Sequence, residues 1–231
     1  MIFDPSDQEQ RLKWVFSSCK NGAWGTEPDG ETDVVCIRAA DFDGRRGRLN
    51  GGERTLRSID PEIYEKLALR SGDIILEKSG GGEKQLVGRA VLFDGEEPSI
   101  TSNFLARCRP APDMEPAFIN YLLLAIYEAR GTFPHLKQST GIQNLDLGSF
   151  LDIRVKIPPL GTQRRIARFL DEKTARIDGL IRKMSGPGPT SIVQNDPSNS
   201  SEKSLLGLLL EYRAAVITAA VTGQIGELNG D

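Results

Sequence analysis

The first two thirds of the chain alternate between short apolar runs and polar turns, a pattern that predicts strands. Four runs rich in β-branched residues are bounded by glycine, proline or charged turns, namely 33–38, 73–78, 85–93 and 99–109. We expect them to form one strongly twisted sheet. Asp60 and Pro61 are typical of a helix start, and a second helix is expected from Glu115 to about Ala129. Residues 1–157 therefore predict an α+β domain.

After Pro159 the apolar period changes to that of a helix. Thr162 to Met184 predicts one amphipathic helix of roughly 35 Å, whose apolar stripe needs a partner helix. Leu205 to Thr222 offers such a partner and ends before Gly223, a typical helix stop. Between the two helices, glycine, proline, serine and asparagine dominate and no period is visible, which predicts a flexible insert. The expected parts are the domain 1–157, a first helical part 158–184, the insert 185–203, and a second helical part with tail 204–231.

Composition excludes several classes of protein. The 231 residues are 39% apolar and 26% charged, enough to bury a sizeable core. Lys and Arg number 29 against 32 Asp and Glu, so the net charge is −3 and a nucleic-acid surface must be local. The longest apolar stretches fall far short of the roughly 18 residues of a membrane span. The first 20 residues show no secretory apolar region. We expect a cytoplasmic protein without a membrane segment.

The residue types needed for metal, nucleotide or nuclease chemistry are scarce. Cys19, Cys36 and Cys108 are an odd number at wide spacings, which favours reduced thiols, two of them on strands, over a disulfide framework or zinc site. His135, the single histidine, is expected in a turn or the core. The glycine run 79–85 lacks the Gly-Lys-Ser/Thr ending of a phosphate loop. The acids and lysine of 171–173 are expected on a solvated helix face. We expect no catalytic residues, metal or cofactor.

Two long segments of the C-terminal helices resemble the helical spacer of type I restriction-modification specificity subunits. These are Ile157 to Ile181 and Leu209 to Ile225, which closes on the Val-Thr-Gly-x-Ile run typical of the family. In the N-terminal part, segments similar to the family's target-recognition domain are Ser71 to Gly80, Val87 to Val91 and Gln138 to Leu145.

The resemblance implies a sequence-specific subunit that reads double-stranded DNA and directs methylation and cleavage by partner subunits. Those partners are a methyltransferase subunit and an endonuclease subunit. Family members hold two recognition domains apart by two packed helices, forming a coiled-coil-like spacer. This sequence has one such domain and one spacer, so it looks like a half-subunit that pairs with an identical or different half. It departs from the family in its insert 185–203 and in Thr162, which stands where the family usually has Glu and is expected as an N-cap.

The candidate DNA-binding residues are cations, amides and hydroxyls in predicted loops, because cations and hydroxyls bind phosphates, and forked donors and amides read bases. The segment from Arg38 to Arg57 contains six arginines and three acids, which gives it a local charge of +3. A solvated loop and a hydrogen-bonded turn are the alternatives for these segments. The candidates are Arg45, Arg46, Arg48, Lys78, Ser79, Lys84, Gln85, Arg89, Lys137, Gln138, Ser139, Thr140, Gln143 and Asn144.

The apolar positions of the two helices are the candidates for a subunit interface. They are Ile166, Phe169, Leu170, Ile177, Leu180, Ile181, Leu209, Val216 and Ile217. Trp14, Trp24 and Phe42 are expected in the core rather than stacked on a base.

Two other functions remain open. A scaffold or regulatory half would bind the methyltransferase through its helices without reading DNA, as the acidic balance and interrupted spacer suggest. An enzyme in its own right is disfavoured because no paired acid, metal or nucleophile set is present.

Overall fold

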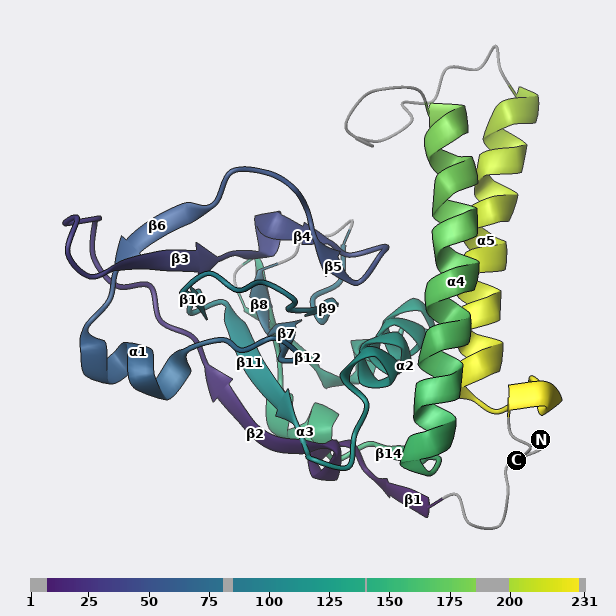
Figure 1. Ribbon diagram of the computed structural model, residues 1–231, viewed down its shortest axis with the longest axis horizontal. Coiled ribbons are helices and arrows are strands. Elements are labelled where there is room, and N and C mark those ends of the chain that lie inside the picture. Colours follow the sequence, from purple (N-terminus) through teal and green to yellow (C-terminus); the bar gives the residue numbers. More distant parts are fainter. Residues whose placement is uncertain (1–7, 81–84, 140, 186–199, 229–231) are drawn as a thin grey trace.

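The computed structural model describes residues 8–80, 85–139, 141–185 and 200–228. A β-rich body lies beside two long helices that run in opposite directions (Figure 1). The helices are α1 (Pro61–Leu67), α2 (Pro116–Glu128), α3 (Leu147–Leu151), α4 (Leu160–Ser185) and α5 (Ser200–Val221). Short 3-10 helices are η1 (Leu12–Val15), η2 (Ala39–Asp41), η3 (Phe133–His135) and η4 (Gly226–Leu228). The predicted α+β class is confirmed.

The strands form several small sheets, so the prediction of one sheet is wrong. A four-stranded sheet has the order β2 (Phe16–Asn21), β11 (Leu105–Pro110), β7 (Ile74–Glu77), β9 (Ala90–Leu92). A three-stranded sheet has the order β10 (Ser99–Thr101), β3 (Asp33–Ile37), β6 (Thr55–Ser58). A second three-stranded sheet has the order β12 (Leu136–Ser139), β13 (Ile142–Leu145), β8 (Ser79–Gly80). Two-stranded ribbons pair β1 (Gln8–Arg11) with β14 (Arg154–Ile157), and β4 (Phe42–Asp43) with β5 (Arg48–Leu49).

A turn splits the run 99–109, which the sequence predicts as one strand. Leu105 N donates to Ser102 O at 3.0 Å and closes the turn, while Ser102 N donates to Ile37 O at 2.9 Å. The residues before the turn therefore continue the sheet of β3, and those after it enter the sheet of β2 and β7. Of the run 85–93, only β9 is a strand.

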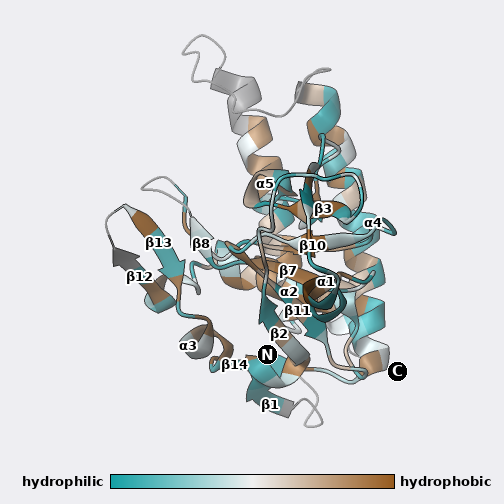
Figure 2. Ribbon diagram, turned by 90° about the vertical axis from the view of Figure 1, so that its left-hand side faces the viewer, coloured by the Kyte–Doolittle hydropathy of each residue, from teal (hydrophilic) through white to brown (hydrophobic). Residues whose placement is uncertain are grey.

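Helix α2 lies between the four-stranded sheet and the two long helices (Figure 1). Phe118, Leu122 and Ala125 on one face are buried, and Ile126 is partly buried. Tyr121, Leu123 and Leu124 on other faces are buried as well. Neighbours on two sides explain this burial, because a helix enclosed by two layers buries most of its circumference. The largest apolar cluster runs from the sheet through α2 into α4 and α5, and hydrophobic colouring gathers inside the body in Figure 2.

The helix predictions hold closely, with small corrections at their ends. Asp60 caps α1 by accepting from Glu62 N and Ile63 N. α4 begins at Leu160, so Thr162 lies within the first turn and is not the N-cap. The predicted insert 185–203 is too long, because Ser185 belongs to α4 and α5 begins at Ser200. The rest of that insert, 186–199, lies outside the described residues. Among the described helices, none is long and apolar enough to cross a membrane.

Candidate functional site

A groove of about 940 Å³ opens where several strands end. β3 and β10 are parallel, so both finish at the same edge, where Thr101 pairs with Ile37. The end of β7 meets the start of β11 through the pair Glu77 and Leu105. The residues that follow or precede these strands therefore converge. Aromatic rings and polar groups share the lining, which includes Trp24, Phe42, Phe104, Arg38, Ser79, Gln85, Arg89 and Asn103.

A buried ion pair closes the inner wall of the groove. Arg89 Nε donates to Glu77 Oε2 at 2.9 Å, and Nη2 donates to Oε1 at 3.0 Å. The Glu77 side chain is only 2% exposed. The same guanidinium reaches Ala39 O at 3.4 Å and lies 5.6 Å from the centre of the Phe42 ring. Arg89, predicted to bind DNA, thus already joins three parts of the groove, and its charge is balanced by Glu77.

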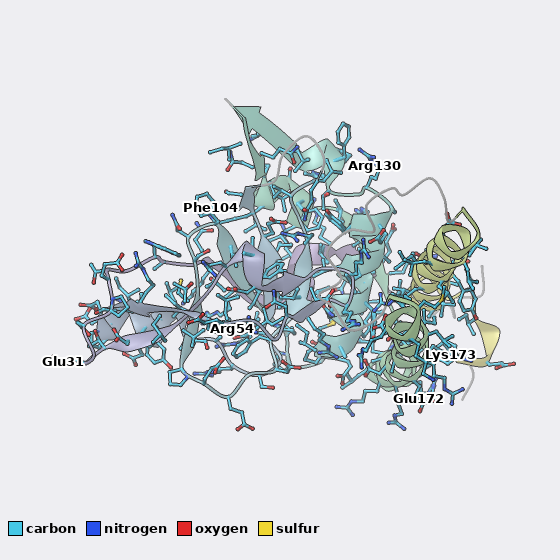
Figure 3. The ribbon with its side chains drawn as sticks, turned by 90° about the horizontal axis from the view of Figure 1, so that it is seen from above. Glu31, Arg54, Phe104, Arg130, Glu172 and Lys173 are labelled. Carbon is cyan, nitrogen blue, oxygen red and sulfur yellow. The ribbon has the colours of Figure 1, made fainter. Side chains whose placement is uncertain are left out.

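The rim of the groove presents aromatic and amide side chains to solvent. Phe104 is 46% exposed and Trp24 is 38% exposed, and Asn103 is exposed beside Phe104. Figure 3 shows Phe104 on the body, far from the two long helices. The Arg57 guanidinium stacks on Trp24, 4.4 Å from the ring centre. Ring faces suit stacking on bases, and forked donors and amides suit base edges.

Arg38 enters the groove from the end of β3. Its Nη2 lies 3.4 Å from Oδ1 of the buried Asp41, and its backbone N–H donates to Asp41 Oδ2 at 2.7 Å. The buried Nε of Arg38 has no hydrogen-bond partner among the described atoms. This N–H group can therefore donate a hydrogen bond to a ligand in the groove.

In the β8–β13–β12 sheet, several side chains predicted to bind DNA make contacts within the chain instead. Ser79 Oγ donates to Asn144 Oδ1 at 2.7 Å, and the buried Gln143 accepts from Val87 N at 3.2 Å. Lys137 Nζ lies 2.6 Å from Asp146 Oδ2, and this contact lowers the pKa of Asp146. Lys78 pairs through its backbone with Phe104 and Leu145. Lys84, Thr140 and the side chains of Gln138 and Ser139 lie outside the described part.

The part of the arginine-rich segment that carries Arg45, Arg46 and Arg48, called the arginine loop below, lies against the long helices. Arg46 Nε lies 3.4 Å from Asp178 Oδ2, and Arg48 Nη2 lies 3.6 Å from Asp171 Oδ1. The Arg45 side chain is exposed, but its carbonyl accepts from Arg213 Nη1 at 2.6 Å. A DNA role for these three arginines stays a prediction, and the contacts show that the loop fastens the β-rich body to the helices.

Helix α4 supplies this contact from one face. Asp171 and Asp178 are seven residues apart, two helical turns, and so point the same way. Arg213 on α5 donates from Nε to Asp178 Oδ1 at 3.0 Å, and Tyr121 on α2 donates to Asp171 Oδ1 at 2.8 Å. Burial is the main cause that raises the pKa of Tyr121 to about 12. The triplet 171–173, predicted on a solvated face, is exposed at its two acids and half-buried at its lysine, and Figure 3 labels its last two residues on α4.

Gly47 lets the arginine loop approach α2 closely. Its φ is +64°, and a Cβ there would lie 2.6 Å from Asn120 Nδ2, which donates to Gly47 O at 3.0 Å. Gly47→Ala is expected to lower the free energy of unfolding by about 1–3 kcal/mol, because both the backbone and this contact would be strained. Gly51→Ala in the same loop is the matched control, since a Cβ there would meet nothing within 4 Å and its φ is not positive. Urea unfolding measures both, and equal losses would contradict the assignment.

Most of the predicted subunit-interface residues are buried inside this chain. Ile166, Leu170, Ile177, Ile181 and Ile217 are at most 6% exposed. Ile166, Leu170 and Ile217 belong to the main core, which joins α4, α5 and the body. Phe169 and Val216 are partly buried against the same core, and Leu209 is half-buried. Only Leu180, 50% exposed, is openly available to another chain. The apolar period of α4 correctly predicts that it packs against a partner helix, and that partner is mostly α5 of the same chain.

Several groove residues are not among the candidates predicted from the sequence. Arg38 enters only the predicted local charge, Trp24 and Phe42 are expected in the core, and Asn103 and Phe104 fall inside a predicted strand. Phe42 is indeed buried, whereas Trp14 and Trp24 are exposed, so the core prediction is wrong for both tryptophans. Asn103 is the available signal, because asparagine inside a β-branched run favours a turn.

The remaining side chains with potential chemistry are the single histidine and the three cysteines. His135 lies in η3, where its Nδ1 is 2.9 Å from Ser149 Oγ and its ring packs edge-on against Phe150. The three cysteines are free thiols, and all of them lie on strands, not two. Within the described ranges, no three His, Cys, Asp or Glu side chains are grouped to hold a metal ion.

Comparison with known proteins gives one family match. Residues 34–183 match the family model described as Type I restriction modification DNA specificity domain. A search of curated sequences finds no significant match.

Among solved structures, the chain is similar to the HsdS subunit from Thermoanaerobacter tengcongensis, with 18% identity and a TM-score of 0.52 over 97% of this chain. It is also similar to a chain from a study of complex assembly and conformational transition of the type I R-M system, with 17% identity and a TM-score of 0.54 over 96% of this chain. In both cases it covers 47% of the other chain, so it spans about half their length.

Proposed function

The chain belongs to the family of type I restriction modification DNA specificity domains, and from this premise we propose that it is a non-catalytic subunit that recognises a specific double-stranded DNA sequence. The observation that carries the proposal is the position of the groove. Its lining from Arg38 to Phe104 falls within the matched residues 34–183. Exposed amide and aromatic side chains at the rim suit base contacts, and the Arg38 guanidinium suits a base edge or phosphate.

In this proposal the groove reads bases and the arginine loop sets the position of the body on the helices. Arg46 and Arg48 are engaged with Asp178 and Asp171, so these two arginines would reach DNA only by giving up their ion pairs. The rim residues Asn103 and Phe104 carry no comparable ion pair. We therefore assign sequence reading first to the rim and second to the Ser79–Gln85–Arg89 side of the groove.

The partners in this proposal are a methyltransferase subunit, an endonuclease subunit and a second recognition half, acting in the cytoplasm. The second half is supported by five exposed apolar or aromatic side chains near one end of the two long helices, which we call together the helix-tip patch. It comprises Leu180, Met184, Leu205, Leu208 and Tyr212, each at least 38% exposed. A second copy that covers this patch would remove apolar area from water.

Binding to DNA by the complex of this chain with its methyltransferase subunit tests the proposal. Asn103→Ala and Phe104→Ala are each expected to weaken binding to the target by roughly 10- to 100-fold, the size of one lost base contact. Binding to unrelated DNA should change little, because that affinity comes mainly from phosphates. Ile63→Ala, on the exposed side of α1, is the matched control and should bind normally.

Two results would contradict this function. If Asn103→Ala and Phe104→Ala both bind the target as the parent does, the groove does not read DNA. If the complex assembles but prefers no DNA sequence, the scaffold function is correct instead, and the helices are the functional surface.

A further inference from the structure

Two of the three cysteines face each other across neighbouring strands. Cys19 on β2 is the direct partner of Cys108 on β11 in the antiparallel ladder. Directly opposed residues of such a ladder point to the same face of the sheet. Cys108 is 1% exposed within the main core, and Cys19 is partly buried against the same cluster.

The hydrogen bonding of the ladder shows which kind of pair this is. Gly22 N donates to Leu105 O at 3.1 Å, which marks Gly22 and Leu105 as a hydrogen-bonded pair. Such pairs alternate along the ladder with pairs that lack backbone hydrogen bonds. Counting three pairs along from Gly22 and Leu105 reaches Cys19 and Cys108, which are therefore a non-hydrogen-bonded pair.

The other edge of β11 agrees with this assignment. Lys78 N donates to Phe104 O at 3.0 Å, so the pair Cys108 and Ile74, four positions further, is hydrogen-bonded. The peptide groups of Cys108 thus point towards β7 and away from β2. Opposed Cα atoms in non-hydrogen-bonded pairs are about 4.5 Å apart, which lies inside the range of about 4.4–6.8 Å that a disulfide spans.

We propose that Cys19 and Cys108 are an oxidation site, where a peroxide converts the two thiols into an intramolecular disulfide that crosslinks β2 and β11. Cys19 reacts first, because it is the more accessible of the two. Its thiolate attacks a peroxide oxygen, the O–O bond breaks, and Cys19 becomes a sulfenic acid. The released hydroxide leaves as water with the proton that the Cys19 thiol lost.

Cys108 completes the reaction. Its sulfur attacks the Cys19 sulfur, the S–O bond breaks, and the leaving hydroxide takes the Cys108 proton as a second water. The two thiols lose two protons and two electrons in total, and the peroxide is reduced to two waters. A side-chain hydrogen bond with Cys19, together with burial, raises the pKa of the Cys108 thiol well above its usual value. Cys108 is therefore a protonated partner held beside Cys19.

Cys36 provides the contrast within the same chain. It is 0% exposed, and its ladder partners are Thr55 on β6 and Ile100 on β10. Burial raises the pKa of its thiol to about 11, and its sulfur donates to Ala23 O at 3.7 Å. No described cysteine opposes it, so it is the natural control.

The crosslink would also join β2 and β11, the two strands whose ends lead to the groove. β2 continues to Trp24, and Phe104 immediately precedes β11. The covalent loop from residue 19 to residue 108 encloses most of the groove segments. In the chain-entropy model a loop of this size raises the melting temperature by on the order of 10 °C.

The experiment treats the purified 231-residue chain with hydrogen peroxide and compares it with a sample kept in dithiothreitol. We expect an intact mass lower by two hydrogens, a Cys19–Cys108 crosslinked peptide in a non-reducing digest, and the rise in melting temperature. Cys36→Ser should behave like the parent. Cys19→Ser should give neither the crosslink nor the rise, while its melting temperature in dithiothreitol stays close to that of the parent.

Three results would overturn the proposal. The first is that Cys19 and Cys108 remain free thiols after peroxide treatment. The second is that Cys19 is recovered as a sulfinic acid beside a free Cys108. The third is a crosslink that joins two chains or involves Cys36. None of these readouts depends on DNA, so the oxidation site and the proposed DNA recognition succeed or fail separately.

Discussion

Replacing Arg89 with methionine is expected to lower the free energy of unfolding by about 3–5 kcal/mol. Methionine keeps much of the length of the side chain but removes both hydrogen bonds to Glu77, whose carboxylate is 2% exposed. A buried carboxylate without its cation bears the full cost of its desolvation, and this cost dominates the effect. Denaturant unfolding followed by circular dichroism gives the value.

Two further variants separate this effect from the loss of a surface charge. Arg45→Met removes an exposed guanidinium from the arginine loop and should change stability by less than about 0.5 kcal/mol. The double variant Glu77→Gln with Arg89→Met should recover part of the loss, because no charge is then buried alone. Equal stability of Arg45→Met and Arg89→Met would show that the ion pair does not hold the groove wall.

Leu170→Ala is expected to lower the free energy of unfolding by about 2–5 kcal/mol. Leu170 is 0% exposed in the core that joins α4 to α5 and the body. Alanine there removes apolar burial and leaves a cavity. The same denaturant titration measures the change.

Leu180→Ala is its matched control, because the substitution and the helix are the same and only the burial differs. Leu180 is 50% exposed in the helix-tip patch, so its truncation should leave the stability of the monomer within about 0.5 kcal/mol. If the patch binds a second copy, Leu180→Ala weakens self-association instead, which sedimentation velocity detects. If Leu180→Ala lowers the free energy of unfolding as much as Leu170→Ala does, the assignment of Leu170 to the core and Leu180 to the surface is wrong.

The helices can be predicted closely because their signals are local. The apolar period fixes α4 and α5 to within a few residues, and the Asp60–Pro61 start of α1 is a side-chain cap that needs no tertiary contact. The sheets cannot be predicted in the same way. Parallel pairing of β10 with β3 joins segments about sixty residues apart, a contact that no local pattern encodes.

The groove is only partly predictable for the same reason. A glycine-rich polar run points to Ser79, Gln85 and Arg89, but Arg38, Asn103 and Phe104 join them only when three distant strand ends meet. The arginine loop shows a second limit of sequence reasoning. A local charge of +3 predicts an acidic partner without identifying it, and acids on α4 lie against the loop. The spacing of the two aspartates on that helix is a signal that could indicate this partner.

The most direct test of the central claim is a map of the DNA sites methylated by the complex of this chain with its methyltransferase subunit. We predict that all modified sites share one defined base sequence, and that Asn103→Ala relaxes the choice of base at one position of it. A complex that assembles but methylates sites with no common sequence, or whose target is unchanged by every rim substitution, would contradict DNA recognition by this groove.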